Sequence, residues 1–399
     1  MQLKELGKNV LLLLVTVIIF LLLFEIALRF ALPQNLSRTQ LDKDLLFSNR
    51  ANLDGVRYSR FHEFQNYIST NSKGLRDSEH NYTKPENTTR ILMLGDSFVE
   101  GVEVGFENTT SKVLEKELNS NPLRKFEVIN AGVSGYGTSQ ELAYLEKEGI
   151  LYHPDVVVLH FFSKNDLLDN VQKAVYSFNP ENNTFTKVER KFSFFQQFWA
   201  FSIAHSHTTN LVANVLLHNQ AIGGFLQRID LLGNHQFEKR DQNLVSLNTT
   251  LSNTTQLNAT PPNIIPVSYT RDIYYDNPRL EIQDSWKKTI IYFNQMQEFS
   301  KKYNFTLVIV FIPAKEQVDV DAYHQFLLQE KLNETQINIL APNAIMEQYA
   351  LQMGIIYLDP TMQFREVDKQ SKLYFINDGH YGDRGHALLA QLLYEKLIK

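Results

Sequence analysis

The chain has 399 residues, of which 43% are hydrophobic, and a formal net charge of −5 at pH 7. This mild charge, together with the lack of a lysine- or arginine-rich run, does not indicate a nucleic-acid partner. The sequence contains no cysteine, which excludes disulfides, thiolate nucleophiles, iron–sulfur clusters and cysteine zinc sites. Its length allows one large domain or two of ordinary size.

The N-terminal segment predicts a helix that crosses a membrane. Residues 10–24 carry no charge, and continuing the helix to Leu32 supplies the length, because a hydrocarbon core roughly 30 Å thick needs about 20 helical residues. Glu25 and Arg29 stand four residues apart, so they can pair on one helix face near the interface. The apolar residues on every face disfavour a buried core helix.

The same segment is expected to remain as an anchor. No small-x-small cleavage site follows the apolar run, which disfavours a cleaved signal peptide. We predict a cytoplasmic tail over residues 1–8 and a signal-anchor helix over 9–32, with the rest of the chain outside the cytoplasm. This orientation depends on Lys4 and Lys8, through a modest positive-inside bias.

Residues 33–89 are polar and broken, and we expect an extracytoplasmic stalk and lead-in there. A regular alternation of strands and helices then begins. The expected strands are 90–95, 125–137 with its glycine-rich end, 154–162, 305–313 and 355–360. The expected helices are 110–120, 139–149, 284–304, 343–354 and 384–399. Several strands are apolar on both faces, which is typical of a parallel sheet covered by helices on both sides. The sequence therefore predicts an α/β domain over residues 90–399.

Residues 171–281 interrupt this alternation, and we interpret them as an insertion into the domain. The segment contains an aromatic run at 192–206, an apolar helical stretch at 210–233 and a low-complexity stretch at 243–263. Its helices could form a lid over the site or pad the core. The aromatic run could also rest on a membrane surface, although it lacks the basic face expected there.

The residues with the most distinctive chemistry follow the ends of the predicted strands, where open α/β sheets bind ligands. They are Gly95-Asp96-Ser97 after the first strand, Gly132, Gly135 and Gly137 after the second, Asn165-Asp166 after the third, and Asp378 and His380 before the last helix. Serine, histidine and a carboxylate, with backbone and amide donors, are the groups needed for acyl transfer through a covalent serine intermediate.

Each group has a defined task in that chemistry. A histidine takes the serine proton, and a carboxylate fixes the tautomer of the histidine. The tetrahedral oxyanion needs preformed donors, which the Ser97 N–H, the Gly135 N–H and the Asn165 amide could supply. Taken singly, each motif has a structural alternative as a helix cap or a turn. Their occurrence in order, each at a strand end or near the last helix, favours the catalytic interpretation.

In this order the motifs Gly95-Asp96-Ser97, Gly135, Asn165-Asp166 and Asp378-Gly379-His380 resemble those of the SGNH/GDSL hydrolase superfamily. The stretch TNSKGLRD at residues 70–77 also looks like the lead-in of its membrane-anchored members. The resemblance implies a flavodoxin-like, three-layer α/β/α sandwich. It also implies a nucleophile, a base and an orienting acid at Ser97, His380 and Asp378, with oxyanion donors at Ser97, Gly135 and Asn165.

Two motifs depart from the pattern of the superfamily. Ser163 stands where its third motif usually has a glycine. Asp378 lies two residues before His380 rather than three, so Asp383 is an alternative orienting acid.

The function implied by the resemblance is a membrane-anchored serine esterase that removes acyl groups, expected to be acetyl, from a carbohydrate or cell-surface glycan. Two alternatives remain open: an O-acyltransferase that acetylates a surface polysaccharide, and an inactive scaffold that binds a glycan or supports assembly. The expected partners are an acylated carbohydrate or other small ester and the membrane. We expect no metal and no cofactor, because no His/Asp/Glu cluster has convincing metal spacing.

Overall fold

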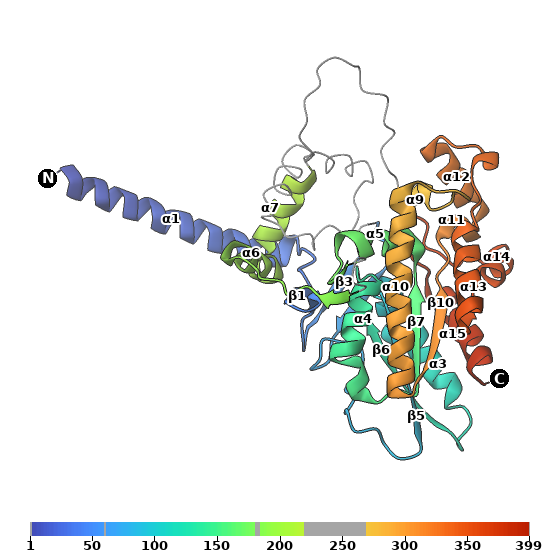
Figure 1. Ribbon diagram of the computed structural model, residues 1–399. Helices are drawn as coiled ribbons and strands as arrows, with labels where there is room; N and C mark the ends of the chain where they lie inside the picture. The colour runs from blue at the N-terminus through green and yellow to red at the C-terminus, as the bar shows by residue number, and fades with distance from the viewer. Residues whose placement is uncertain (1, 60, 180–183, 219–268, 399) are drawn as a thin grey trace. The chain divides into compact units, whose positions relative to one another are not determined.

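The computed structural model describes residues 2–59, 61–179, 184–218 and 269–398 (Figure 1). These residues form two compact units. The first, here called the helical unit, consists of residues 2–43 and 191–218. The second, the sheet unit, consists of the described residues in 44–190 and 269–398.

The helical unit contains the predicted N-terminal helix. Its elements are α1 (Gln2–Ala31), β1 (Thr39–Asp42), α6 (Phe194–His205) and α7 (His207–His218). Within α1, the segment Lys4–Ala31 is long and apolar enough to cross a membrane. The aromatic run of the predicted insertion forms α6.

The centre of the sheet unit is a parallel five-stranded sheet in the order β11-β10-β7-β5-β6. Its strands are β5 (Thr88–Gly95), β6 (Lys125–Gly132), β7 (Val156–Phe161), β10 (Thr306–Phe311) and β11 (Ile356–Leu358). These are the five strands expected from the sequence, so the predicted parallel sheet is confirmed. Their apolar runs suit this position because helices cover a parallel sheet on both faces.

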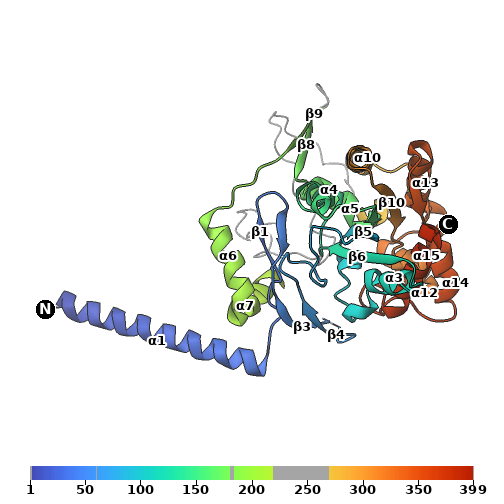
Figure 2. The same ribbon diagram turned by 90° about the horizontal axis from the view of Figure 1, so that it is seen from below.

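Helices cover both faces of the sheet, as Figure 2 shows for α4 and α10 on one side and α3 and α15 on the other. The predicted helices are α3 (Thr110–Leu118), α4 (Thr138–Lys147), α10 (Leu280–Tyr303), α13 (Ala341–Met353) and α15 (Asp383–Ile398). Further short helices are α2 (Ser97–Glu100), α5 (Ser163–Gln172), α9 (Tyr269–Asp272), α11 (Lys315–Val318), α12 (Val320–Glu330) and α14 (Thr361–Asp368), and the 3-10 turns are Phe106–Asn108, Gly149–Tyr152 and Glu334–Gln336. This arrangement is a three-layer α/β/α sandwich.

Successive residues of each strand pack into opposite layers, because side chains alternate along a strand. Val158 of β7 belongs to the buried cluster that also contains Leu114 of α3 and Leu389 of α15. Phe161 points to the other layer, where its ring meets Phe293 of α10 at a centroid distance of 5.3 Å. Both apolar layers end at the carboxyl edge of the sheet, where the polar motifs begin.

The lead-in differs from the expected stalk over residues 33–89, because residues 44–89 belong to the sheet unit. They contain β2 (Leu46–Asn49) and an antiparallel hairpin of β3 (Asp54–Tyr58) and β4 (Gln65–Ser69). Arg76 and Asp77 are buried. The polar residues that suggested a stalk in the sequence therefore include groups that fold against the sheet.

The predicted insertion at 171–281 starts with a hairpin of β8 (Tyr176–Asn179) and β9 (Thr184–Lys187) in the sheet unit. Helices α6 and α7 follow in the helical unit. The low-complexity stretch and most of the apolar helical stretch fall in residues 219–268, which lie outside the described residues.

Candidate active site

Ser97 is the first residue of α2, directly beyond the carboxyl end of β5. In the sheet, Gly95 of β5 pairs with Gly132 of β6, so both strands end at the same level. A Cβ on Gly132 would lie 2.3 Å from the Glu100 nitrogen. Glycine at this position therefore lets α2 rest directly on the end of the neighbouring strand. Asp96 caps α2, since its side chain accepts a hydrogen bond from the Phe98 N–H.

Three side chains form a continuous chain of contacts across 283 residues of sequence. The Oγ of Ser97 lies 2.7 Å from Nε2 of His380, and Nδ1 of His380 lies 2.5 Å from Oδ1 of Asp378. The two histidine nitrogens thus face a hydroxyl on one side and a carboxylate on the other. This is the arrangement in which a carboxylate holds the imidazole so that its second nitrogen can accept the serine proton.

The loop that carries Asp378 and His380 is held from both sides. Glu63 accepts hydrogen bonds from the backbone N–H groups of Asn377 and Asp378, at 3.0 and 2.9 Å. Lys315 donates to the carbonyls of Phe375 and Ile376, at 2.7 and 2.6 Å. These bonds from two distant segments fix the backbone that positions the histidine and its carboxylate.

A second carboxylate, Glu103, lies beside the histidine, with Oε1 3.6 Å from Nδ1 of His380. Burial alone would lower the pKa of His380, but Glu103, Asp378 and Asp96 raise it to about 10. For Asp378, burial raises the pKa, whereas the hydrogen bond and the charge of His380 lower it below its usual value. The neighbouring carboxylates therefore favour the imidazolium form of His380, next to an ionised Asp378, at neutral pH.

Asn165 lies on α5, the helix that follows β7, and its amide points at the capping residue of α2. Nδ2 of Asn165 donates to Oδ2 of Asp96 over 2.6 Å. Asp96 takes one N–H of this amide, and the other N–H is the candidate oxyanion donor. The neighbouring Asp166 is buried, and its side chain accepts from the Phe162 N–H at 2.8 Å, which fixes the start of α5. The two residues of the Asn-Asp motif thus have different tasks.

Gly135 lies in the turn after β6 and has a positive φ of 81°, a conformation that favours glycine. Glu100, three residues after Ser97 on α2, holds this turn. It accepts hydrogen bonds from the N–H of Ser134 at 2.8 Å and from the Ser134 hydroxyl, and its other oxygen accepts from Asn49 at 3.1 Å. The buried carboxylate of Glu100 therefore ties the candidate donor turn to the helix of the nucleophile.

Replacing Gly135 with alanine is expected to lower both activity and stability. A side chain at a φ of 81° costs roughly 1–2 kcal/mol, and relief of that strain would move the Gly135 N–H. Gly354, at the end of α13, provides a matched control, because its φ of 64° is also positive and a Cβ there meets nothing within 4 Å. Gly354→Ala should lower the melting temperature similarly and leave kcat/KM unchanged. Equal kcat/KM values for the two variants would contradict a role of Gly135 in the site.

The lead-in supplies further support beneath the site. Arg76 is buried and donates to the carbonyls of Glu100, at 3.0 Å, Gly101 and Val104, at 2.8 Å. It therefore holds the loop after α2 that contains Glu103.

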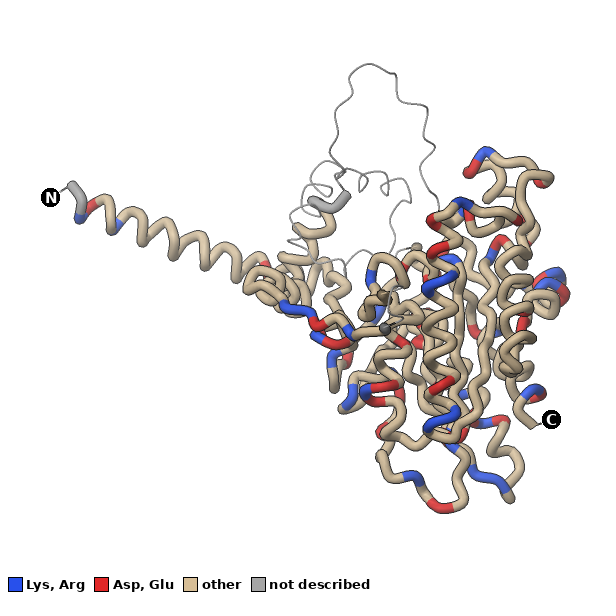
Figure 3. The backbone as a smooth tube through the Cα atoms, in the orientation of Figure 1, with Lys and Arg blue, Asp and Glu red and all other residues tan. Residues whose placement is uncertain are grey.

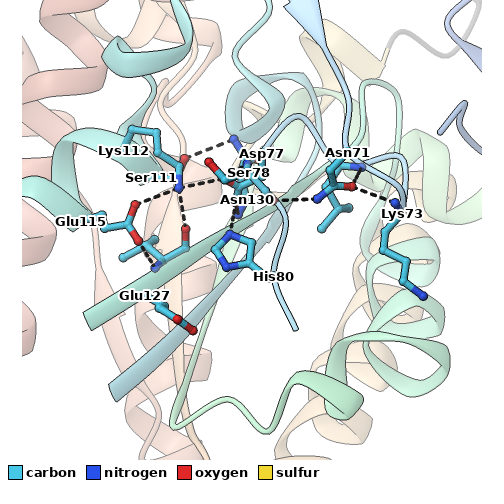
Figure 4. A network of polar contacts seen from close by, with 12 residues as sticks. Asn71, Lys73, Asp77, Ser78, His80, Ser111, Lys112, Glu115, Glu127 and Asn130 are labelled. Carbon is cyan, nitrogen blue, oxygen red and sulfur yellow. Dashed lines mark hydrogen bonds and ion pairs between the residues drawn. The ribbon is translucent and has the colours of Figure 1, made fainter. Parts of the chain in front are cut away.

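Asp77, the next residue, forms an ion pair with Lys112 at 2.7 Å and accepts from the Asn130 N–H at 2.7 Å (Figure 4). Burial raises the pKa of Asp77, but His80 and Lys112 lower it below the usual value. Because Asn130 in turn donates to the Val99 carbonyl at 2.8 Å, the network links the lead-in to β6 and α2.

The structure brings together most of the residues singled out in the sequence. Ser97 contacts His380, which in turn contacts Asp378, while Asn165 and Gly135 connect to α2 through Asp96 and Glu100. Asp383, the alternative acid, is exposed at the start of α15. Sequence reasoning missed the supporting groups Glu63, Arg76, Glu100 and Glu103. Of these, Glu100 and Glu103 had a detectable signal, because they are carboxylates in the apolar stretch directly after the serine. Among the described residues, no group of three or more His, Asp and Glu side chains is placed to hold a metal ion.

No protein-family model and no curated protein matches the sequence. Several solved structures resemble the chain. An acetyl xylan esterase is 14% identical, with a TM-score of 0.39, and the match covers 77% of this chain and 98% of that one. A variant of an acetylxylan esterase from Geobacillus stearothermophilus is 12% identical, with a TM-score of 0.38 and coverages of 77% and 94%. A lipolytic protein of the G-D-S-L family from Veillonella parvula is 12% identical, with a TM-score of 0.38 and coverages of 77% and 97%. These are distant likenesses, and the function proposed below is based on the geometry of the site.

Proposed function

We propose that the protein is a serine-dependent carboxylic ester hydrolase that works through an acyl-serine intermediate. The observation that carries this proposal is the chain of contacts from the Ser97 hydroxyl through His380 to Asp378, at 2.7 and 2.5 Å. A serine hydroxyl is a weak nucleophile until a positioned base takes its proton. An ionised carboxylate on the far side of that base stabilises the imidazolium that forms.

The reaction proceeds in two halves. In the neutral form of His380, Oγ of Ser97 attacks the ester carbonyl carbon while its proton passes to Nε2 of His380. The oxyanion then accepts hydrogen bonds from the N–H groups of Ser97 and Gly135 and the amide of Asn165. Collapse breaks the ester C–O bond, and the alcohol leaves with the proton from His380. Water then attacks the acyl-serine with His380 as base, which releases the carboxylic acid and restores the serine.

The substrate class and the cellular arrangement are also part of the proposal. The motifs of the site resemble those of the SGNH/GDSL hydrolases, and we take an acetylated carbohydrate or cell-surface glycan as the substrate. Residues 9–32 anchor the chain in a membrane, with residues 1–8 in the cytoplasm. Residues 33–89, of which 44–89 fold with the sheet unit, lead into an extracytoplasmic hydrolase domain at 90–399 with an insertion at about 171–281. If a sugar hydroxyl attacked the acyl-serine in place of water, the product would be an O-acetylated sugar, and the protein would act as an O-acyltransferase.

A fluorophosphonate probe tests the proposal without knowledge of the substrate, because it reacts with activated serine hydroxyls. Mass spectrometry of the full-length protein is expected to find the label on Ser97. The labelling rate should rise about tenfold per pH unit from pH 7 to 9, because the base must be neutral and the pKa of His380 is raised to about 10.

One result would contradict the proposal: the absence of label on Ser97 at any pH, which would favour a non-catalytic binding scaffold. Labelling that does not change between pH 7 and 9 would contradict the raised pKa of His380, because a histidine base with an ordinary pKa is already neutral throughout that range. A second assay then distinguishes water from a sugar hydroxyl as the acyl acceptor. The protein is incubated with acetylated xylooligosaccharide, with and without an acceptor glycan. Hydrolysis yields acetate, whereas transfer yields an acetylated acceptor.

A further inference from the structure

Helix α6 of the helical unit exposes a row of phenylalanine side chains. The exposed fractions of Phe194, Phe195, Phe198 and Phe201 are 75, 65, 59 and 62%. These positions follow one another at i, i+1, i+4 and i+7, so they share one face of the helix. The rings of Phe194 and Phe198 are stacked, with centroids 6.4 Å apart, which makes the face a continuous aromatic surface.

The opposite face of α6 is used for packing. Ile203 and Ala204 are buried, and the Ile203 carbonyl accepts a hydrogen bond from the Ser37 N–H at 3.0 Å. At about 100° per residue, Ile203 lies on the far side of the helix from Phe194 and Phe198. Both faces of α6 are thus apolar, but among the described residues of the unit only one of them is covered. A helix that displays four large aromatic side chains in this way needs an apolar environment on that side.

Hydrogen bonds join the end of α6 to the end of the apolar run of α1. Glu25, directly after that run, accepts from the Ser206 hydroxyl and from the N–H groups of His207 and Thr208, at 2.9, 2.9 and 2.8 Å. Arg29 donates to the His205 carbonyl at 3.1 Å. The carboxylate thereby caps α7, and the arginine satisfies a carbonyl at the end of α6. The position of α6 along α1 is therefore set by the residues at the end of the apolar run.

The distribution of charge matches this position (Figure 3). The coloured segments of α1 lie near its two ends, and the sequence from Phe194 to Ala204 contains neither a lysine or arginine nor an acidic residue. Lys191 is exposed shortly before α6, and Arg29 is exposed beside its end. Cations that flank an aromatic helix are suited to lipid phosphates, while the aromatic rings enter the boundary of the acyl chains.

From these observations we infer that α6 is an interfacial helix whose phenylalanine face enters the lipid bilayer beside α1. The inference rests on the proposal that α1 spans the membrane, and it adds a second, peripheral contact of this chain with the same bilayer. The occupant of the exposed face is the lipid surface, because the face is joined to the point where α1 leaves the hydrocarbon core.

The cysteine-free sequence makes a direct test possible with single-cysteine variants of the full-length protein in liposomes. Phe198→Cys reports on the centre of the aromatic face, and Gln197→Cys, one residue earlier, is the matched control at an exposed position on the edge of that face. Leu14→Cys reports on α1, and Lys301→Cys on an exposed helix of the sheet unit. Each cysteine is labelled with a fluorophore and quenched either by iodide in water or by lipids with a nitroxide near the headgroup or deep in the acyl chain.

The label at Phe198→Cys should be quenched several-fold more strongly by the shallow nitroxide lipid than the label at Lys301→Cys, and several-fold less by iodide. Gln197→Cys should fall between them, and Leu14→Cys should respond to the deep nitroxide lipid. Iodide quenching of Phe198→Cys equal to that of Lys301→Cys would overturn the inference. Shielding of the Phe198→Cys label from both iodide and the nitroxide lipids would also overturn it, because it would indicate that protein covers this face. If Leu14→Cys responds to lipid in these cases, only the interfacial helix is refuted. If it does not, the anchor is refuted as well.

Discussion

Replacing Ser97 with alanine is expected to reduce the hydrolysis of p-nitrophenyl acetate by roughly 10⁴-fold or more, because the nucleophile is lost and no acyl-enzyme can form. The side chain is small and sits at the first position of α2, whose cap is the side chain of Asp96 rather than that of Ser97. Folding should therefore be preserved. The measurement is kcat/KM for the full-length protein, with the melting temperature recorded in parallel.

The control for this variant is Ser120→Ala, in an exposed turn after α3. It changes the same chemical group outside the site and should leave kcat/KM unchanged. Turnover by Ser97→Ala at the wild-type rate, with the label of the fluorophosphonate on another serine, would place the activity elsewhere. A large loss of melting temperature in Ser97→Ala alone would indicate a structural rather than a chemical role.

The second prediction with a large expected effect concerns the two carboxylates near His380, Asp378 and Glu103, and compares the variants in which each is replaced by its amide. Asp378→Asn is expected to lower kcat by roughly 10³–10⁴-fold, because the amide no longer fixes the productive tautomer of the imidazole. Glu103→Gln should lower the plateau of kcat/KM by less than about tenfold, since Glu103 lies 3.6 Å from the histidine and acts mainly through its charge. Full pH profiles of both variants provide the measurement.

The pH profiles also distinguish the two carboxylates by how each variant changes the dependence of kcat/KM on pH. Glu103 raises the pKa of His380, so its replacement by glutamine should move the rise of kcat/KM to lower pH. Asp378→Asn should reduce the rate at every pH. If Glu103→Gln had the larger loss at the plateau, the orienting acid would be Glu103, and Asp378 would only shape the loop.

The sheet could be predicted because each strand is a short apolar run next to a helix with its own periodicity. The run before Ser97 became β5, and the apolar stretch before Asn165 became β7. Local pattern did not reveal that the lead-in folds with the sheet unit, because polar residues such as Arg76 and Asp77 become buried only when distant carbonyls and charges meet them. A polar sequence is a reliable sign of exposure only where such tertiary partners are absent.

Only the site residues that stand in a short sequence motif could be predicted. Ser97, Asn165 and His380 occur in short motifs at the ends of elements, and the parallel topology brings such ends together. Glu63 had no signal, because its task is to hold the backbone at Asp378, which lies 315 residues away in the sequence. The choice between Asp378 and Asp383 also needed the structure, since it depends on the course of the loop between Phe375 and His380.

The cap of α7 by Glu25 has a consequence for how the chain is made. Glu25 and Ser206 are 181 residues apart, so a ribosome that adds 5–20 residues per second reaches Ser206 roughly 10–40 s after Glu25. By then β5, β6 and β7 have been synthesised, but β10 and β11 have not. All residues of the helical unit are therefore synthesised before the last two strands of the sheet, so the contact between Glu25 and α7 can form while the sheet still lacks β10 and β11.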